Sequence, residues 1–226
     1  MSSFGQGCHV RHWALTVVLL TLVTGCSSVV PLSTTRESPK PPTPTATTTK
    51  SNTIASAPTE GIWSKLQGKE TGYVVMMRHA LAPGIGDPPN FELDDCSTQR
   101  NLSAEGRAQA VRMGEAFRRR NIRVTKILSS QWCRCLETAK LMNLGSVEPL
   151  EGLNSFFRQP RTQSKQTAQV RRFIVDNRDN HGVIIMVTHQ VNITALTDLV
   201  PQSGESVVLR ANQQNQVELV GRIEGL

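Results

Sequence analysis

The stretch at residues 183–189 reads VIIMVTH and decides the fold class. Five consecutive apolar residues precede Thr188 and His189 in it. A short, continuous apolar run of this kind predicts a strand that is buried on both faces of a sheet. A second continuous run, at residues 73–77, precedes Arg78 and His79. A shorter apolar stretch at residues 124–128 (VTKIL) predicts a third strand and precedes a pair of serines.

Segments with helical spacing of apolar residues separate these runs, and Ser103 is placed to cap the first of them. Strands that alternate with helices predict an α/β fold, with a mostly parallel sheet and helices on both of its faces. The predicted helices cover residues 103–120, 132–143, 163–177 and 192–199, and two closing strands cover residues 206–209 and 216–223.

The first 25 residues predict an export signal. An apolar run over residues 13–23 would rise about 16 Å as a helix, which is too short for the ~30 Å core of a bilayer. It ends in the residues VTGC, which resemble the bacterial lipobox and imply a mature chain that begins at a lipidated Cys26. An ordinary secretory signal with an incidental Cys is the alternative.

A tether is predicted over residues 26–60 and a single folded domain over residues 61–226. Six Pro and thirteen Ser or Thr lie between Pro31 and Glu60. Such a segment buries too little apolar surface to offset the entropy of ordering. The remaining 166 residues are enough for one packed core.

The formal net charge of +7 favours anionic partners, but the excess is spread along the chain. Residues 118–120 form a basic run without interleaved aromatic residues. This favours a solvated helix end over a nucleic-acid site, so no nucleic-acid partner is expected.

Basic side chains follow the predicted strands at the points where the strands end. Arg78 and His79 follow the first strand, Arg134 comes shortly after the second, and His189 follows the third. Because ligands bind at the carboxyl ends of strands in open α/β sheets, we expect these four side chains to converge there.

Two guanidiniums and two imidazoles suit the transfer of a phosphoryl group. The guanidiniums can bind a dianion through several hydrogen bonds. One imidazole can attack phosphorus and form a phosphohistidine, and the other can donate to the equatorial oxygens in the transition state. We expect no cofactor and no metal, since no group of Cys and His has ligand spacing.

Four motifs, in order along the chain, resemble those of the histidine phosphatase superfamily (phosphoglycerate-mutase-like). The resemblance implies a three-layer sandwich in which His79 is the nucleophile, Arg78 and Arg134 bind phosphate, and His189 binds phosphate and stabilises the transition state. The family's motifs are an apolar strand with Arg-His-Gly, Leu-Thr-x-x-Gly-x-x-Gln-Ala, Ser-x-x-x-x-Arg-x-x-x-Thr-Ala, and a last strand with His; they correspond here to VVMMRHA at 74–80, NLSAEGRAQA at 101–110, SSQWCRCLETA at 129–139 and VTH at 187–189.

The sequence departs from this family in two ways. Ala80 replaces the Gly that usually follows the nucleophile. The family places its general acid either in a Leu-x-Glu segment or just after the last His, and here LNSFF at residues 153–157 and Gln190-Val191 occupy those positions without a carboxylate.

Three other carboxylates are candidates for the general acid. Asp94 and Asp95 lie in the loop at residues 83–99, which is rich in Gly and Pro and is expected to overhang the site. Glu151 is close in sequence to the missing Glu. We favour Asp95, although each could equally be a solvated loop carboxylate.

Three cysteines remain in the predicted domain: Cys96, Cys133 and Cys135. Export permits disulfides, and a bond between cysteines two residues apart would be strained. We therefore expect Cys96 to pair with Cys133 or Cys135; three reduced thiols are the alternative.

Together these features predict a phosphomonoester hydrolase of the bacterial cell envelope, anchored by lipid on the periplasmic face of a membrane. Its substrate would be a small phosphorylated molecule or a phosphoryl group of the cell surface. A phosphate-binding module with weak or no catalysis is an alternative, favoured by the missing acid. A mutase-type phosphotransferase fits less well, because the matching Glu is absent. The sequence leaves the oligomeric state open.

Overall fold

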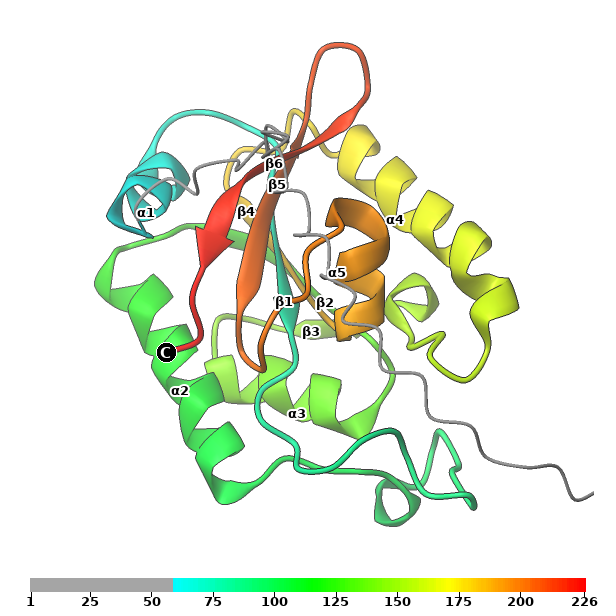
Figure 1. Ribbon diagram of the computed structural model, residues 1–226. Coiled ribbons are helices and arrows are strands. Elements are labelled where there is room, and N and C mark those ends of the chain that lie inside the picture. Colours follow the sequence, from blue (N-terminus) through cyan, green and yellow to red (C-terminus); the bar gives the residue numbers. More distant parts are fainter. Residues whose placement is uncertain (1–58) are drawn as a thin grey trace, which may run out of the picture. The chain divides into compact units, whose positions relative to one another are not determined.

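The computed structural model describes residues 59–226 (Figure 1). The predicted signal peptide, the lipidation site Cys26 and the tether up to residue 58 lie outside the described residues. None of the helices from residue 59 onward combines the length and the apolar character needed to cross a membrane.

Six strands form one mixed sheet in the order β3-β2-β4-β1-β5-β6. The four strands β3, β2, β4 and β1 run parallel. Strand β5 pairs antiparallel with β1 on one side and with β6 on the other. The predicted α/β class is therefore confirmed. The strands are β1 (Tyr73–Arg78), β2 (Val124–Ser129), β3 (Val147–Pro149), β4 (Val183–Thr188), β5 (Ser206–Ala211) and β6 (Val217–Ile223).

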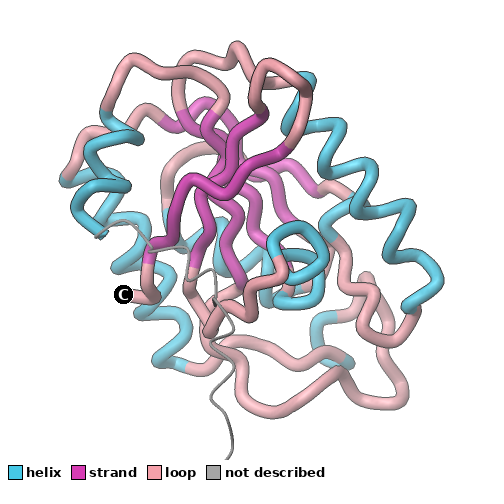
Figure 2. The backbone as a smooth tube through the Cα atoms, turned by 45° about the horizontal axis from the view of Figure 1, so that its top comes forward, coloured by secondary structure: helices cyan, strands magenta, loops and turns pink. Residues whose placement is uncertain are grey.

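Helices cover both faces of the sheet (Figures 1 and 2). Val75 and Met77 of β1 pack in one apolar cluster with α1, α2 and α3, whereas Val74 and Met76 pack in another with α4 and α5. This alternation along β1 produces the three layers. The helices are α1 (Thr59–Gln67), α2 (Ala104–Arg119), α3 (Cys133–Met142), α4 (Gln163–Asp176) and α5 (Gln190–Thr197), with 3₁₀ helices η1 (Cys96–Thr98), η2 (Glu151–Leu153) and η3 (Pro160–Thr162).

Helix α2 begins against the segment that follows β1. Ser103 caps it as predicted, because its hydroxyl accepts from the amide of Gly106 at 3.0 Å. The amide of Ser103 donates to the carbonyl of Leu81 at 3.0 Å. A Cβ at Gly106 would lie 2.1 Å from the same carbonyl oxygen, so only Gly permits this close approach. The contact fixes where the chain leaves β1.

Candidate active site

The last residues of the parallel strands β1, β4 and β2 lie side by side at the carboxyl ends of these strands. Arg78 of β1 lies in register with Thr188 of β4, and Ser129 of β2 lies in register with Val187. The rings of His79 and His189, the residues that follow β1 and β4, are 5.5 Å apart between centroids. The structure thus brings the two predicted imidazoles together.

His79 is held in a single tautomer. Its Nδ1 lies 2.8 Å from the carbonyl oxygen of Ala80, so Nδ1 carries the hydrogen and donates it. Nε2 then carries no hydrogen, and its lone pair accepts from Nε of Arg134 at 3.1 Å. Burial and the positive charge of Arg134 lower the pKa of His79 to about 3. The imidazole is therefore neutral, as a nucleophile must be.

Ala80 does not disturb this arrangement. Its φ is not among the positive values in residues 59–226, so the position does not need Gly. The methyl group is buried, and the amide of Ala80 donates to Oγ1 of Thr138 at 3.1 Å.

His189 is oriented by a chain of hydrogen bonds. Arg134 can only donate, so Nδ1 of His189 accepts from its Nη2 at 3.4 Å. Nε2 of His189 then carries the hydrogen and donates to Oγ of Ser130 at 2.8 Å, and Ser130 donates to Oδ1 of Asn154 at 3.3 Å. Burial and the charge of Arg134 hold the pKa of His189 well below its usual value. The sequence reasoning missed Asn154, although it lies in the segment where the family places its Glu.

Arg134 is almost fully buried and connects the site. Its five N–H groups all have acceptors: Nε donates to His79, Nη1 to Asp87 and to the carbonyl of Arg100, and Nη2 to Asp87 and to His189. One side of the guanidinium, Nε and Nη2, thus faces the two imidazoles. Its far end faces Asp87.

Arg78 has a buried donor without a partner. Nη1 donates to the carbonyl of Pro201 at 2.9 Å, whereas Nε is buried without a hydrogen-bond partner among the described residues. Buried polar groups are rarely left unpaired, so this N–H is available to a bound anion.

Asp87 and Arg100 are further members of the site that sequence reasoning missed. Oδ1 of Asp87 lies 2.6 Å from Nη1 of Arg134, and Oδ2 accepts from the indole of Trp132 at 3.1 Å. Arg100 donates its amide to Asp87 at 3.2 Å, and its guanidinium holds the carbonyls of Ala82 and Gly86. Burial alone would raise the pKa of Asp87, but the hydrogen bonds and charge of Arg134 outweigh it and lower this pKa. Asp87 is therefore an anion here.

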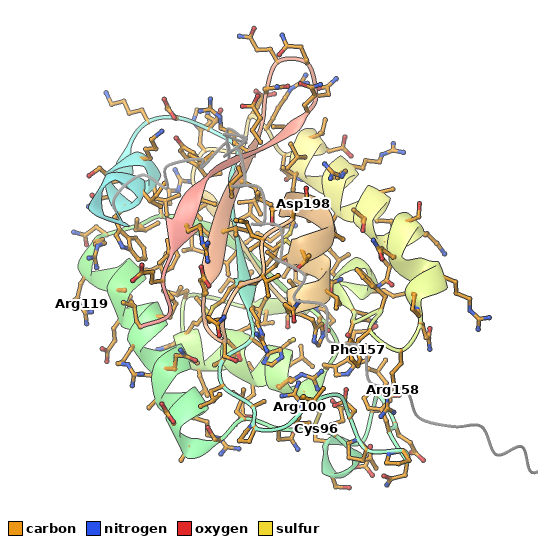
Figure 3. All side chains as sticks on the ribbon, in the orientation of Figure 1. Cys96, Arg100, Arg119, Phe157, Arg158 and Asp198 are labelled. Carbon is orange, nitrogen blue, oxygen red and sulfur yellow. A yellow bond between two sulfur atoms is a disulfide. The ribbon has the colours of Figure 1, made fainter. Side chains whose placement is uncertain are left out.

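A cavity of about 620 Å³ opens at this edge, a size typical of small-molecule sites. The four predicted residues, Asp87 and Arg100 all line it. Figure 3 shows Arg100, Phe157 and Arg158 close together at the end of the domain where β1 ends, whereas Arg119 and Asp198 lie away from it. The outer lining includes Ile85, Phe91, Leu93, Trp132, Phe157, Arg158 and Lys165.

The charge of this cavity suits a dianion. Its lining holds five cationic side chains and two carboxylates, which leaves a formal net charge of +3 around two neutral imidazoles. The cationic side chains are Arg78, Arg100, Arg134, Arg158 and Lys165, and the carboxylates are Asp87 and Glu151. No group of side chains suited to hold a metal ion occurs within the described part of the chain.

The candidates for the general acid do not contact the predicted phosphate-binding residues. Asp95 accepts from the amide and hydroxyl of Ser97, at 2.9 and 2.7 Å, and caps η1. Neither Asp94 nor Asp95 lines the cavity, because η1 turns both outward to solvent. Glu151 does line it, but at an exposed position on η2.

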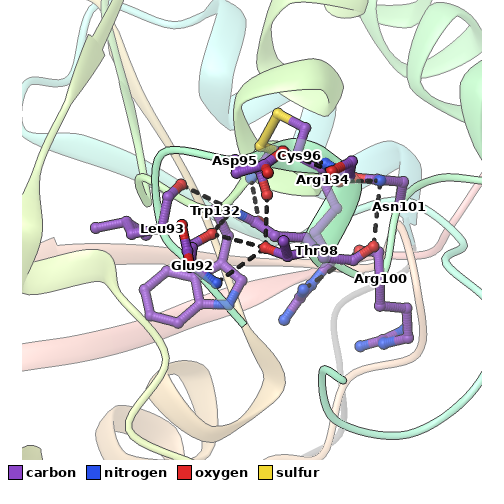
Figure 4. Close-up of a disulfide and its surroundings, with 12 residues drawn as sticks. Glu92, Leu93, Asp95, Cys96, Thr98, Arg100, Asn101, Trp132 and Arg134 are labelled. Atoms are coloured by element: carbon purple, nitrogen blue, oxygen red, sulfur yellow. Dashed lines mark hydrogen bonds between the residues drawn. A yellow bond between two sulfur atoms is a disulfide. The ribbon is translucent and has the colours of Figure 1, made fainter. Parts of the chain in front are cut away.

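A disulfide between Cys96 and Cys133 ties the loop after β1 to the start of α3 (Figure 4). The predicted pairing of Cys96 is thus confirmed, with Cys133 as its partner. Cys133 immediately precedes Arg134, and Cys96 follows the loop that carries Asp87, so the bond closes one side of the site. Cys135 is free and fully buried, and burial raises its pKa to about 12. Its thiol therefore stays protonated.

The chain is similar to proteins of known family and structure. The model of the histidine phosphatase superfamily (branch 1) matches residues 74–156. No curated protein matches the sequence. Bacillus stearothermophilus YhfR is 13% identical with a TM-score of 0.52, over 67% of this chain and 96% of that chain.

Two other solved structures have TM-scores of 0.49. The protein histidine phosphatase SixA, complexed with tungstate, is 12% identical over 68% of this chain and 97% of its own. A mycobacterial glucosyl-3-phosphoglycerate phosphatase, in complex with VO3, is 17% identical over 66% of this chain and 97% of its own. The family match thus covers the part of the chain that carries Arg78, His79 and Arg134, and YhfR shares the fold of the described domain.

Proposed function

We propose that this protein hydrolyses phosphate monoesters through a phosphohistidine formed on His79. The supporting observation is the unprotonated Nε2 of His79, whose lone pair accepts from Arg134 inside a cavity of net positive charge. A phosphoryl group that enters the cavity replaces the contacts from Arg134 to the two imidazoles. It then receives hydrogen bonds from the Nε and Nη2 side of Arg134 and from the unpaired Nε of Arg78.

The reaction has two steps. In the first, Nε2 of His79 attacks phosphorus while the bond to the ester oxygen breaks. In the second, water attacks the phosphohistidine and the N–P bond breaks. His189 accepts at Nδ1 before substrate binds, so it takes up a proton there to become a donor to the equatorial oxygens. The nearby dianion favours that proton uptake.

The place of action that we propose is the bacterial cell envelope, outside the cytoplasm. The support comes from the sequence: the apolar run at residues 13–23, the lipobox-like residues before Cys26 and the polar tether that follows. Acyl chains on Cys26 would hold the domain at a membrane surface. The Cys96–Cys133 disulfide is consistent with an oxidising compartment.

A panel of phosphate esters tests the activity directly. We expect the full-length chain to release phosphate from p-nitrophenyl phosphate and from some alkyl or sugar phosphates, with inhibition by vanadate. Absence of turnover on the whole panel would refute the proposal.

A phosphate-binding module is the second candidate function. It is favoured by the full engagement of all five N–H groups of Arg134 and by the absence of contact between the expected acids and the phosphate-binding residues. Binding of phosphate or vanadate without turnover would support this alternative.

A further inference from the structure

The proposed reaction lacks a proton donor among the residues that sequence reasoning favours. An alkoxide leaves from phosphorus slowly unless a positioned acid protonates it. Only two carboxylates line the cavity within the described residues, those of Asp87 and Glu151. Glu151 is exposed, whereas the side chain of Asp87 is nine-tenths buried.

Resting on the proposed function, we propose that Asp87 is the catalytic acid and base of this site. It protonates the ester oxygen in the first step and accepts a proton from the attacking water in the second. Asp87 lies outside the four motifs that resemble the family, which span residues 74–80, 101–110, 129–139 and 187–189.

The position of Asp87 suits this role. Nε of Arg134 contacts the nucleophilic nitrogen of His79, whereas Nη1 and Nη2 at the far end of the guanidinium contact Asp87. Asp87 therefore lies beyond the guanidinium as seen from His79. In-line attack places the leaving oxygen on the side of phosphorus opposite to the nucleophile. Asp87 thus lies at the end of the guanidinium away from the nucleophile, where our proposal places the leaving oxygen.

The surroundings hold Asp87 in this place. Trp132 and the amide of Arg100 donate to its two oxygens, and Arg158 donates to its backbone carbonyl. The disulfide at Cys96 anchors the far part of the same loop. A donor must be held within hydrogen-bond reach of the atom that it protonates, and these contacts supply that restraint.

Substrate binding can raise the pKa of Asp87, so that its carboxylate takes up the proton that the reaction needs. Before binding, the hydrogen bonds and charge of Arg134 keep the pKa of Asp87 low. A phosphoryl dianion shares Arg134 and adds negative charge beside the carboxylate, and both effects raise this pKa. Binding is then accompanied by uptake of one proton from solvent at Asp87, in addition to the proton that His189 takes up. The charged and titratable groups around Asp87 are Arg134 on α3, Arg100 after η1 and Arg158 after η2, with Arg78, His79, His189, Glu151 and Lys165 elsewhere in the cavity lining.

The protons balance over the cycle. Protonated Asp87 gives its proton to the ester oxygen as the P–O bond breaks and the N–P bond forms, which releases the alcohol and leaves a carboxylate. Water then attacks phosphorus and gives one proton to Asp87, while the N–P bond breaks. Hydrogen phosphate then leaves, the pKa of Asp87 falls again beside the unoccupied Arg134, and Asp87 releases to solvent the proton that was taken up on binding.

The dependence on the leaving group tests this role. For Asp87→Asn in the full-length chain, we expect kcat/KM on an alkyl phosphate to fall by about 100-fold or more, because general acid catalysis contributes about 10²–10⁴-fold. For p-nitrophenyl phosphate, whose phenolate leaves without a proton, kcat/KM reports the first step alone and should fall by less than about 5-fold. Glu92→Gln is the matched control: the same chemical change in the same loop, at an exposed side chain outside the cavity lining. It should leave both rates unchanged.

Asp87→Glu keeps a carboxyl group and should retain the native ratio of alkyl to aryl turnover. An equal fall in kcat/KM on both substrates in Asp87→Asn would overturn the role of Asp87 as acid, since that result is expected if Asp87 only orients Arg134. Unchanged alkyl turnover would overturn it as well. These results leave the native activity intact, so they differ from failure of the proposed function, in which the native chain turns over neither substrate.

Discussion

Burial of His79 in its neutral form makes the stability of the fold depend on pH. Burial and Arg134 lower the pKa of His79 to about 3 in the folded state, whereas an unfolded His titrates near about 6.5. Between these values the unfolded chain binds a proton that the folded chain does not. The free energy of unfolding therefore falls as the pH falls, and from about pH 7.5 to about pH 5 this one group accounts for about 2 kcal/mol.

Replacement of His79 by Asn isolates this contribution. The Asn amide can still donate to the carbonyl of Ala80 as Nδ1 does, but it has no proton to bind. Urea unfolding, followed by tryptophan fluorescence, should show that the native chain loses about 2 kcal/mol more than His79→Asn between the two pH values. His189, whose pKa is also lowered, keeps some pH dependence in the variant.

The control is His181→Asn, which changes an exposed imidazole just before β4, at the opposite edge of the sheet. It should lose as much stability as the native chain. Equal losses in the native chain and in His79→Asn would show that His79 is not held neutral in the fold, and the description of it as a nucleophile with an unprotonated Nε2 would be refuted.

Two further predictions concern the disulfide and the anchor. The double variant Cys96→Ser, Cys133→Ser removes a disulfide that spans 37 residues, and it should lower the free energy of unfolding by about 2–4 kcal/mol in urea titrations. Unchanged stability of this variant would contradict the prediction, and so would three free thiols found by mass spectrometry of exported protein. Cys26→Ser should move the protein from the membrane fraction to the soluble fraction on cell fractionation, and continued association with the membrane would count against lipidation.

The sequence predicted the parts of the site that short-range patterns specify. Arg78, His79 and His189 directly end or follow strands of continuous apolar residues, and such strands are recognisable without knowledge of their neighbours. Arg134 could be placed because α3 starts just after β2. Their common edge then follows from parallel strand order alone.

Residues whose place depends on the path of a loop were missed. Asp87 lies in a segment without periodicity, and its approach to Arg134 depends on the disulfide and on Arg100, both distant in the sequence. An Asp followed by two prolines in a Gly-rich loop was the only signal. Asp95, the carboxylate that the sequence favours as the general acid, accepts from Ser97 and caps the 3₁₀ helix η1, a local contact that no periodic pattern specifies.

Two elements of the fold were also missed. The spacing of Ile62, Trp63 and Leu66 was an available sign of α1, whose buried face they form. The helix begins two residues before the predicted domain start at residue 61. Strand β3 has only three residues at the edge of the sheet, which is too few for any periodic pattern.

The most direct test is to identify the residue that carries phosphate during turnover. The full-length chain, mixed rapidly with ³²P-labelled p-nitrophenyl phosphate and quenched in alkali, should carry an acid-labile, base-stable phosphate that peptide mapping assigns to His79. His79→Asn should carry none and should not turn over. Phosphate on any other residue, or sustained turnover by His79→Asn, would contradict the assignment of His79 as the nucleophile.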